Sequence, residues 1–194
     1  MSSTFDIDDI EFSHPKSNGL GGQHLFLNKN NEQKFRLQTP KCGVPFGLNE
    51  YNGKFTIDLQ LKGGEVEEFK NEIKSLDELI LTKAKKNSFQ WFKKSLHESV
   101  VQELYKPQLR QNGDYPPLMK IKIPFKKSLF DGEIYNEKCE KVSIDYITKG
   151  CQIQAIVENT GVFFTSGSFG TGWKAVQLKV FPSQKLTGYA FIEE

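Results

Sequence analysis

The spacing of apolar residues changes twice along this chain, from a strand period to a helix period and back. Apolar and polar residues alternate over Phe55–Leu61, which is typical of a strand with one buried face. Over Phe69–Ile80 the apolar spacing becomes helical, with acids before this stretch and lysines after it, as the helix dipole favours. Alternation returns over Met119–Phe125. We therefore expect an α+β protein, mainly antiparallel β, in which a small barrel carries a two-helix insertion at about residues 65–106.

Turn and cap residues place further elements. The pair Asn52-Gly53 predicts a hairpin before the clearest strand. Either Asn87 or Ser88 can cap a second helix that runs to about Tyr105. This helix would be apolar on two sides, with Phe89, Phe92, Leu96 and Val100 on one and Trp91, Val101 and Tyr105 on the other. Other strands are expected near 34–38, 132–135, 141–146, 152–157, 162–165 and 174–181.

The 194 residues fit one domain with extensions. We expect residues 1–31 to be an acidic segment that is poorly ordered or only partly docked, and residues 32–194 to be a single domain. Acids alternate with aromatic and aliphatic residues over Phe5–Phe12. This segment is therefore either a solvated tail or a peptide that docks on a partner or covers the protein's own basic groove.

Signals for secretion, membrane insertion and disulfides are missing from the sequence. The N-terminus has acids where a signal peptide needs a basic region, and no apolar run approaches the ~20 residues of a membrane span. We therefore expect an intracellular protein, cytoplasmic or nuclear, that is not secreted. The 3 cysteines lack the spacing of a zinc site and indicate reduced thiols.

Catalytic motifs are also missing from the sequence. The glycine-rich stretch 166–172 is not followed by the Gly-Lys-Ser/Thr of a phosphate-binding loop, and the histidines are scattered. We expect a protein that is not an enzyme and that uses no metal or cofactor. An enzyme whose site is assembled from distant residues is the alternative to this expectation.

Basic and aromatic residues share segments that contain no acid. These windows cover 33–49, 79–97, 115–130 and 159–192. The formal net charge is only +2, so the signal is segregation rather than overall charge. Separated basic segments with interleaved aromatics suit a polyanion with stackable faces, and single-stranded nucleic acid fits that description.

Within these windows, strand alternation separates residues that could contact nucleic acid from residues of the core. Lys120 and Lys122 share the outward face of one strand, and Lys126 extends the charge beyond it. The alternative is an edge strand that lysines protect from aggregation. Because the adjacent Phe163 and Phe164 cannot both face the core of a strand, one of them should lie outside as a stacking platform.

The sequence says less about the placement of the two tryptophans and of the last acid-free window, 159–192. Alternation there directs Val176 and Val180 inward and Lys179 outward. Trp91 and Trp173 have no certain place in the core.

Five segments between about Phe35 and Phe181 carry a resemblance to a known family. They are FRLQTPKC, NSFQWFKKSLHESVVQELYKP, YPPLMKIKIP, KGCQIQAIVENTGVFF and GTGWKAVQLKVFP. They resemble the single-stranded-DNA-binding proteins of large DNA viruses, which are related to the phage type built on an OB fold. The resemblance implies an OB-like barrel that holds unpaired DNA, with no cofactor and no turnover. By position it implies DNA contacts on Lys120, Lys122, Trp91, Lys94, Trp173, Lys174 and Lys179.

The resemblance is weakest at the C-terminus. Phage relatives carry a long acidic C-terminal tail, whereas this sequence ends YAFIEE with only two acids. The acidic-aromatic stretch is N-terminal instead. Regulation by a tail is therefore in doubt, or moved to Phe5–Phe12.

The leading hypothesis is a non-enzymatic single-stranded-DNA-binding protein that acts in viral DNA replication, recombination or repair. Its partners would be single-stranded DNA and, through the acidic N-terminal segment, replication proteins. A homo-oligomer is compatible with the sequence, and no membrane is involved. The alternative is a virion structural or assembly protein whose outer aromatics contact protein. The candidate DNA-binding residues are Lys120, Lys122, Lys126, Trp91, Lys94, Phe163, Phe164, Trp173, Lys174 and Lys179.

Overall fold

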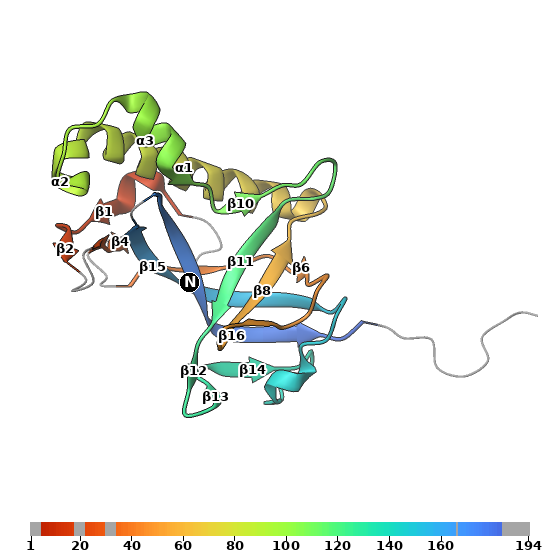
Figure 1. Ribbon diagram of the computed structural model, residues 1–194. Coiled ribbons are helices and arrows are strands. Elements are labelled where there is room, and N and C mark those ends of the chain that lie inside the picture. The colour runs from red at the N-terminus through yellow and green to blue at the C-terminus, as the bar shows by residue number, and fades with distance from the viewer. Residues whose placement is uncertain (1–4, 18–21, 30–33, 166, 184–194) are drawn as a thin grey trace, which may run out of the picture.

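A circuit of hydrogen-bonded strands closes on itself in the computed structural model (Figure 1). The structure describes residues 5–17, 22–29, 34–165 and 167–183. β8 (Lys54–Gln60) pairs antiparallel with β11 (Leu118–Ile123), which pairs parallel with β16 (Phe169–Phe181). β16 forms a long antiparallel hairpin with β15 (Gln152–Phe164), and β6 (Cys42–Gly43) connects β15 back to β8. This circuit is a small barrel, and the predicted α+β class with mainly antiparallel strands is confirmed.

Shorter elements surround the barrel. The strands are β1 (Ile10–Phe12), β2 (Lys16–Ser17), β3 (Gln23–Leu25), β4 (Leu27–Lys29), β5 (Arg36–Gln38), β7 (Asn49–Tyr51), β9 (Tyr105–Lys106), β10 (Leu109–Arg110), β12 (Phe125–Lys126), β13 (Leu129–Phe130) and β14 (Glu133–Tyr135). Single turns of 3₁₀ helix are η1 (Ile7–Asp9), η2 (Gly64–Val66) and η3 (Ile144–Tyr146).

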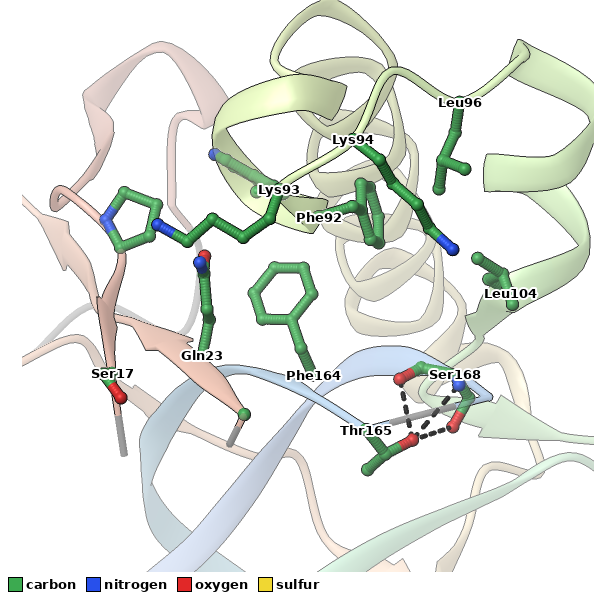
Figure 2. A pocket seen from close by; sticks show the side chains of 13 residues that line it. Ser17, Gln23, Phe92, Lys93, Lys94, Leu96, Leu104, Phe164, Thr165 and Ser168 are labelled. Carbon is green, nitrogen blue, oxygen red and sulfur yellow. Dashed lines mark hydrogen bonds between the residues drawn. The ribbon is translucent and has the colours of Figure 1, made fainter. Parts of the chain in front are cut away.

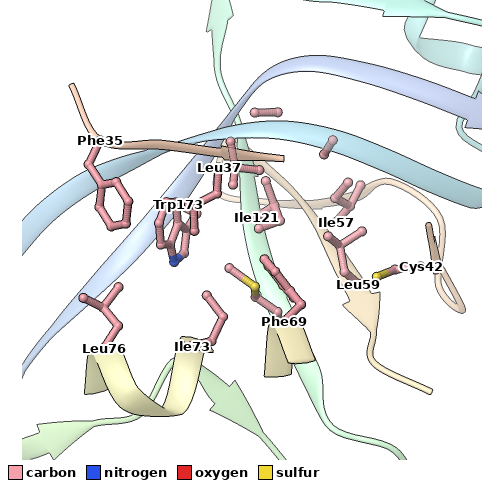
Figure 3. Close-up of a cluster of buried hydrophobic side chains, with 14 of the residues drawn as sticks. Phe35, Leu37, Cys42, Ile57, Leu59, Phe69, Ile73, Leu76, Ile121 and Trp173 are labelled. Atoms are coloured by element: carbon pink, nitrogen blue, oxygen red, sulfur yellow. The ribbon is translucent and has the colours of Figure 1, made fainter. Parts of the chain in front are cut away.

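Helix α1 (Glu67–Lys86), which the helical spacing predicted, lies across one end of the barrel. Figure 3 shows Phe69, Ile73 and Leu76 pointing from this helix into the cluster that contains Trp173. Each of these apolar side chains contributes about 1.5–3 kcal/mol when it is fully buried. The helix therefore closes the hydrophobic interior that the strands alone would leave exposed.

The predicted second helix is two helices, α2 (Ser88–Phe92) and α3 (Glu98–Leu104). Lys93 ends α2 in the left-handed conformation, with φ of 61°. His97 then caps α3, where its side chain accepts a hydrogen bond from the Ser99 N–H. The expectation of one continuous helix is wrong, because a left-handed residue interrupts the helical path.

The two predicted apolar sides of the helical segment differ in burial. Trp91, Val101 and Tyr105 are buried, whereas Phe89 is 68% exposed and Val100 is also exposed. Phe92 and Leu96 are half-buried and pack against the same core, so the helical segment contacts the barrel with residues from both predicted sides.

The described part of the N-terminal segment packs on the barrel. Leu25 and Leu27 are buried, and Ile10 joins the same core. β1 pairs with β4, and β3 pairs with β15. The expectation of a poorly ordered or only partly docked segment does not describe residues 5–17 and 22–29, because their apolar side chains complete the core.

The acidic part of this segment lies along α1. Phe5, Asp6 and Ile7 line a hollow together with Glu68 and Glu72 of that helix. The acids of η1 therefore lie beside α1.

Several strand predictions are confirmed and two are revised. The Asn52-Gly53 hairpin forms between β7 and β8, with φ of 50° and 69° at its two central residues. The strand expected at 141–146 is instead an isolated bridge followed by η3. The strands expected at 152–157 and 162–165 form one continuous strand, β15.

A buried polar network ties α1 to the barrel. The Asp77 carboxylate accepts hydrogen bonds from the Tyr105 hydroxyl (2.5 Å) and from the Gln108 side-chain amide (2.7 Å). The Gln108 backbone N–H also donates to Asp77 (3.1 Å), and the Trp173 indole N–H donates to the Gln108 side chain (2.5 Å). One carboxylate therefore links the helix, the segment after α3 and strand β16.

We predict that Asp77→Ala lowers the free energy of unfolding by about 3 kcal/mol, because it leaves buried donors on Tyr105 and Gln108 without their acceptor. Urea denaturation at neutral pH measures the change. Glu78→Ala, on the exposed side of the same turn, is the control and should change stability by less than about 0.5 kcal/mol. A loss below about 1 kcal/mol for Asp77→Ala would contradict the role given to this network.

Candidate nucleic-acid interface

Two lysines lie opposite each other on the outside of the barrel. In the parallel register of β11 and β16, Lys122 is the partner of Lys174 and Ile121 is the partner of Trp173. Ile121 and Trp173 are buried, so both lysines point outward. Lys120 lies on the same face of β11, where it is exposed and faces the next strand, β8.

A bulge in β16 turns Lys174 outward. One face of a regular strand would carry residues 174, 176, 178 and 180. Alternation predicted that Val176 and Val180 point inward, so Lys174 would point inward with them. The pairing with β15 skips Val176, because Val157 faces Ala175 and Ile156 faces Gln177. Alternation therefore changes phase there, and Lys174 faces outward although Leu178 and Val180 face inward.

A second irregularity, in β15, directs Phe163 outward. The pairing with β16 is interrupted between Asn159 and Val162, where Gly161 has φ of 82°. A Cβ at Gly161 would lie 2.4 Å from the Leu25 carbonyl oxygen, so only glycine fits this bulge. Beyond it Phe163 is 37% exposed and Phe164 is 8% exposed. The prediction that one of this pair lies outside the core is confirmed.

An aromatic group forms around Phe163. His24 is its partner on β3, and the His24 ring packs edge-on against Phe26 with ring centroids 4.4 Å apart. The His24 Nε2 lies 2.7 Å from the Thr160 carbonyl oxygen, which fixes the ring next to the bulge. Phe26 is 43% exposed, so the group offers two rings to solvent.

The ammonium group of Lys122 lies beside this aromatic group. Its Nζ is 5.7 Å from the centroid of the Phe163 ring, which is within cation–π range. Burial of the ammonium group lowers the pKa of Lys122, and repulsion from Lys54 lowers it further. A bound anion would relieve that repulsion, so the position favours a phosphate.

A buried carboxylate holds the neighbouring cations in place. Glu158 is the cross-strand partner of both Lys174 and Arg36, and its oxygens lie 2.9 Å from the Lys174 Nζ and 2.8 Å from the Arg36 guanidinium. Lys34 approaches it at 3.9 Å. Burial tends to raise the pKa of Glu158, but the hydrogen bonds from Lys174 and Arg36 outweigh it and hold that pKa below its usual value. The Glu158 carboxylate therefore restricts the side chains of three basic residues, Lys34, Arg36 and Lys174.

A hollow of about 240 Å³ adjoins these cations and connects them with the aromatic group. Its described lining residues are Phe26, Leu27, Lys34, Phe35, Glu158, Asn159, Thr160 and Lys174. We call the whole surface the outer basic face and define it by Lys34, Arg36, Lys54, Lys120, Lys122 and Lys174 with His24, Phe26 and Phe163.

The sequence pattern of a "Family of unknown function (DUF5871)" matches residues 57–193, which is more than half of the chain. The chain belongs to this family. A curated relative, "Uncharacterized protein L291" of Acanthamoeba polyphaga mimivirus, is 29% identical over 164 residues, which is 77% of this chain. The chain spans only 26% of the length of that relative.

Solved structures share the fold. The crystal structure of gp2.5, a single-stranded DNA binding protein encoded by bacteriophage T7, has a TM-score of 0.55 at 13% identity, covering 80% of this chain and 91% of that one. The single-stranded DNA-binding protein from bacteriophage Enc34 has a TM-score of 0.52 at 11% identity, covering 81% and 87%. At these identities the likeness establishes an OB-like barrel with a helical insertion, as was expected.

The other residues that the sequence suggested as DNA contacts lie outside the outer basic face. Trp91 (4% exposed) and Trp173 (1% exposed) belong to the core, a placement that the sequence had left open. The Trp173 indole N–H is used by Gln108, and the Trp91 ring packs against Phe12 and Phe164. Neither ring presents a face on which a base could stack.

Three lysines from the sequence-based set are also separate from the outer basic face. Lys126 lies in the β12–β13 hairpin beyond the end of β11, and Lys94 lines a pocket with the buried Phe164. Lys179 is five residues beyond Lys174 on β16, or roughly 16 Å at a strand rise of about 3.3 Å. There its Nζ donates to the Cys139 sulfur at 3.3 Å.

Five residues of the outer basic face were missed from sequence: His24, Phe26, Lys34, Arg36 and Lys54. Lys34 and Arg36 alternate with the buried Phe35 and Leu37, so strand periodicity could have found them. Nothing in the local sequence marks His24 or Phe26, because their position depends on the pairing of β3 with β15.

No cluster of three metal-ligating side chains occurs among the residues that the structure describes. Within the same residues, none of the helices is long and apolar enough to cross a membrane.

We predict that the stability contributed by Glu158 depends on pH. Its folded-state pKa is below the usual 4.5, so its contribution is present above that pH and is lost as pH falls through the folded-state value. Glu158→Gln should therefore destabilise the protein at pH 7, and the difference from the natural chain should shrink toward pH 3. Urea denaturation at both pH values measures this. Glu50→Gln on the exposed β7 is the control, and a difference for Glu158→Gln that is constant with pH would contradict the prediction.

Proposed function

We propose that this chain binds single-stranded DNA on the outer basic face and catalyses no reaction there. The carrying observation is the juxtaposition of Lys122 and Lys174 on neighbouring strands with the exposed ring of Phe163. Lysines attract the phosphates, and an exposed ring provides a stacking surface for bases of any sequence.

The charge of this face favours a polyanion over a protein partner. Its two acids, Asp58 and Glu158, are each 6–7% exposed and each is paired with cations, Asp58 with Arg110 at 2.7 Å. An approaching strand therefore meets lysines rather than carboxylates. An aromatic ring at the same place requires unpaired bases, because the bases of a duplex are already stacked on each other.

The role of the protein is proposed from its relatives. The solved proteins of similar fold are named as single-stranded DNA-binding proteins of bacteriophages, and the curated relative is a mimivirus protein. These names support single-stranded DNA as the ligand and a virus as the setting, and within that setting we propose a role in replication, recombination or repair of viral DNA.

We predict that oligo(dT) binding weakens steeply with salt. Because each neutralised phosphate contributes about −0.7 to the slope of log K against log salt for single strands, three or four lysine contacts give a slope of roughly −2 to −3. Fluorescence anisotropy across a salt series measures it. Lys120→Glu with Lys122→Glu should lower both the affinity and the slope, whereas the matched change of the exposed α1 residues Lys83 and Lys86 to Glu should lower them less.

Two results would refute this proposal: no binding at low salt, or an affinity that does not change with salt. Copurification with capsid components and without nucleic acid would instead favour the virion structural or assembly alternative.

We predict that Phe163→Ala weakens oligo(dT) binding by about 1–3 kcal/mol, since it removes the stacking ring but leaves the lysines. Phe46→Ala is the matched control, because Phe46 is 54% exposed and lies outside the outer basic face. The salt slope should be the same in both variants. Equal affinities for the two variants would show that Phe163 is not a stacking platform.

A further inference from the structure

Another hollow, larger than the one beside Glu158, lies on the other side of the β3–β15 ribbon (Figure 2). Phe163 and His24 face the outer basic face, whereas their neighbours Phe164 and Gln23 line this hollow. Helix α2 and the tip of the β15–β16 hairpin complete it. Its volume of about 720 Å³ falls within the range of small-molecule sites, roughly 300–1,000 Å³. We call it the hairpin pocket.

Two phenylalanine rings form a corner in the hairpin pocket. The rings of Phe92 and Phe164 are 5.4 Å apart between centroids and nearly perpendicular, at 82°. Phe164 is backed by the parallel ring of Phe169 at 5.7 Å and by Trp91 at 5.8 Å. Because these rings are fixed by packing on one another, a planar ligand in the corner would meet a rigid aromatic wall.

Two lysines extend over the corner from the turn that ends α2. Figure 2 shows Lys93 reaching toward the side where Gln23 lies and Lys94 reaching toward Leu104. Lys93 has φ of 61°, a conformation that costs a residue with a Cβ about 1–2 kcal/mol. Glycine would avoid this cost, so a lysine at this position is consistent with a use for its side chain.

Uncharged polar groups complete the lining. Thr165 and Ser168 place their hydroxyl oxygens 3.0 Å apart at the hairpin tip, and Gln23 lies on the opposite wall. Among the described residues that line the pocket, none is acidic. The pocket therefore combines an aromatic corner, hydrogen-bonding groups and two positive charges.

We propose that the hairpin pocket binds a nucleoside monophosphate, with the base against the half-buried ring of Phe92 and the phosphate attracted by Lys93 and Lys94 at the rim. This ligand has the three properties that the lining matches: a flat π surface, hydrogen-bonding edges and a negative charge. It can be a free nucleotide or the terminal nucleotide of a strand. Only the second source rests on the proposed function.

The site is tested by titrating the full chain with thymidine 5′-monophosphate in a calorimeter, with intrinsic fluorescence as a second readout. Trp91 lines the pocket, whereas Trp173 is buried in the barrel, so a fluorescence change reports on the pocket. We expect saturable binding with Kd below about 1 mM. Lys93→Gln with Lys94→Gln should weaken it about tenfold or more, since charge-assisted contacts to the phosphate are lost.

The matched control is Lys83→Gln with Lys86→Gln, which removes the same charge from exposed positions on α1 and should leave nucleotide binding unchanged. Lys120→Gln with Lys122→Gln should also leave it unchanged while weakening oligo(dT), so failure of the pocket and failure of the outer basic face are distinguishable. Absence of saturation at millimolar nucleotide, or an equal loss in the α1 control, would overturn the proposal.

Competition identifies the source of the nucleotide. If the pocket holds a strand end, a 5′-phosphorylated linear oligo(dT) displaces the monophosphate, and a circular single strand without ends does not. If neither displaces it, the ligand is a free nucleotide. Displacement by both at equal nucleotide concentration would show that the monophosphate binds the outer basic face, and the hairpin pocket would be rejected.

Discussion

The parallel pairing of β11 with β16 is the constraint on which the rest of the structure depends. It closes the barrel, and in a closed barrel each strand residue faces either the interior or the surface. The same register that buries Ile121 against Trp173 places Lys122 beside Lys174 on the outside. The hydrophobic core and the positive surface are therefore two results of one strand pairing.

The helical insertion extends this constraint to the far end of the molecule. Helix α1 closes the interior, and Asp77 joins it through Gln108 to Trp173 inside the barrel. The hairpin pocket has walls from the helical layer and from the barrel, and these walls are packed together by the ring of Phe92 against Phe164 and Phe169.

Periodicity was sufficient to predict the elements whose pattern is regular. The strand Phe55–Leu61, the helix across 69–80 and the lysine-bearing strand at 118–123 were all expected, and the barrel followed from their order. Alternation predicted that one of Phe163 and Phe164 lies outside, but neither which of the two it is nor the outward position of Lys174 could be derived from it, because a bulge shifts the phase of each strand.

Burial of the tryptophans was equally hidden from sequence. Trp91 and Trp173 sit among lysines in the sequence but among apolar rings or barrel residues in space. A left-handed residue at Lys93 ended the helix that was expected to run on to about Tyr105. Both differences come from tertiary contacts, which outweigh local preference when a large ring can be buried.

Glu158 gives the outer basic face a property that its cations alone would lack. Long basic side chains on a surface sample many rotamers, and each loses up to about 2 kcal/mol of conformational entropy when a ligand immobilises it. The buried carboxylate has already restricted Lys174 and Arg36 during folding. Under the proposed function, Glu158 would thus lower the entropic cost of binding phosphates, although its charge cancels one of the positive charges of the outer basic face.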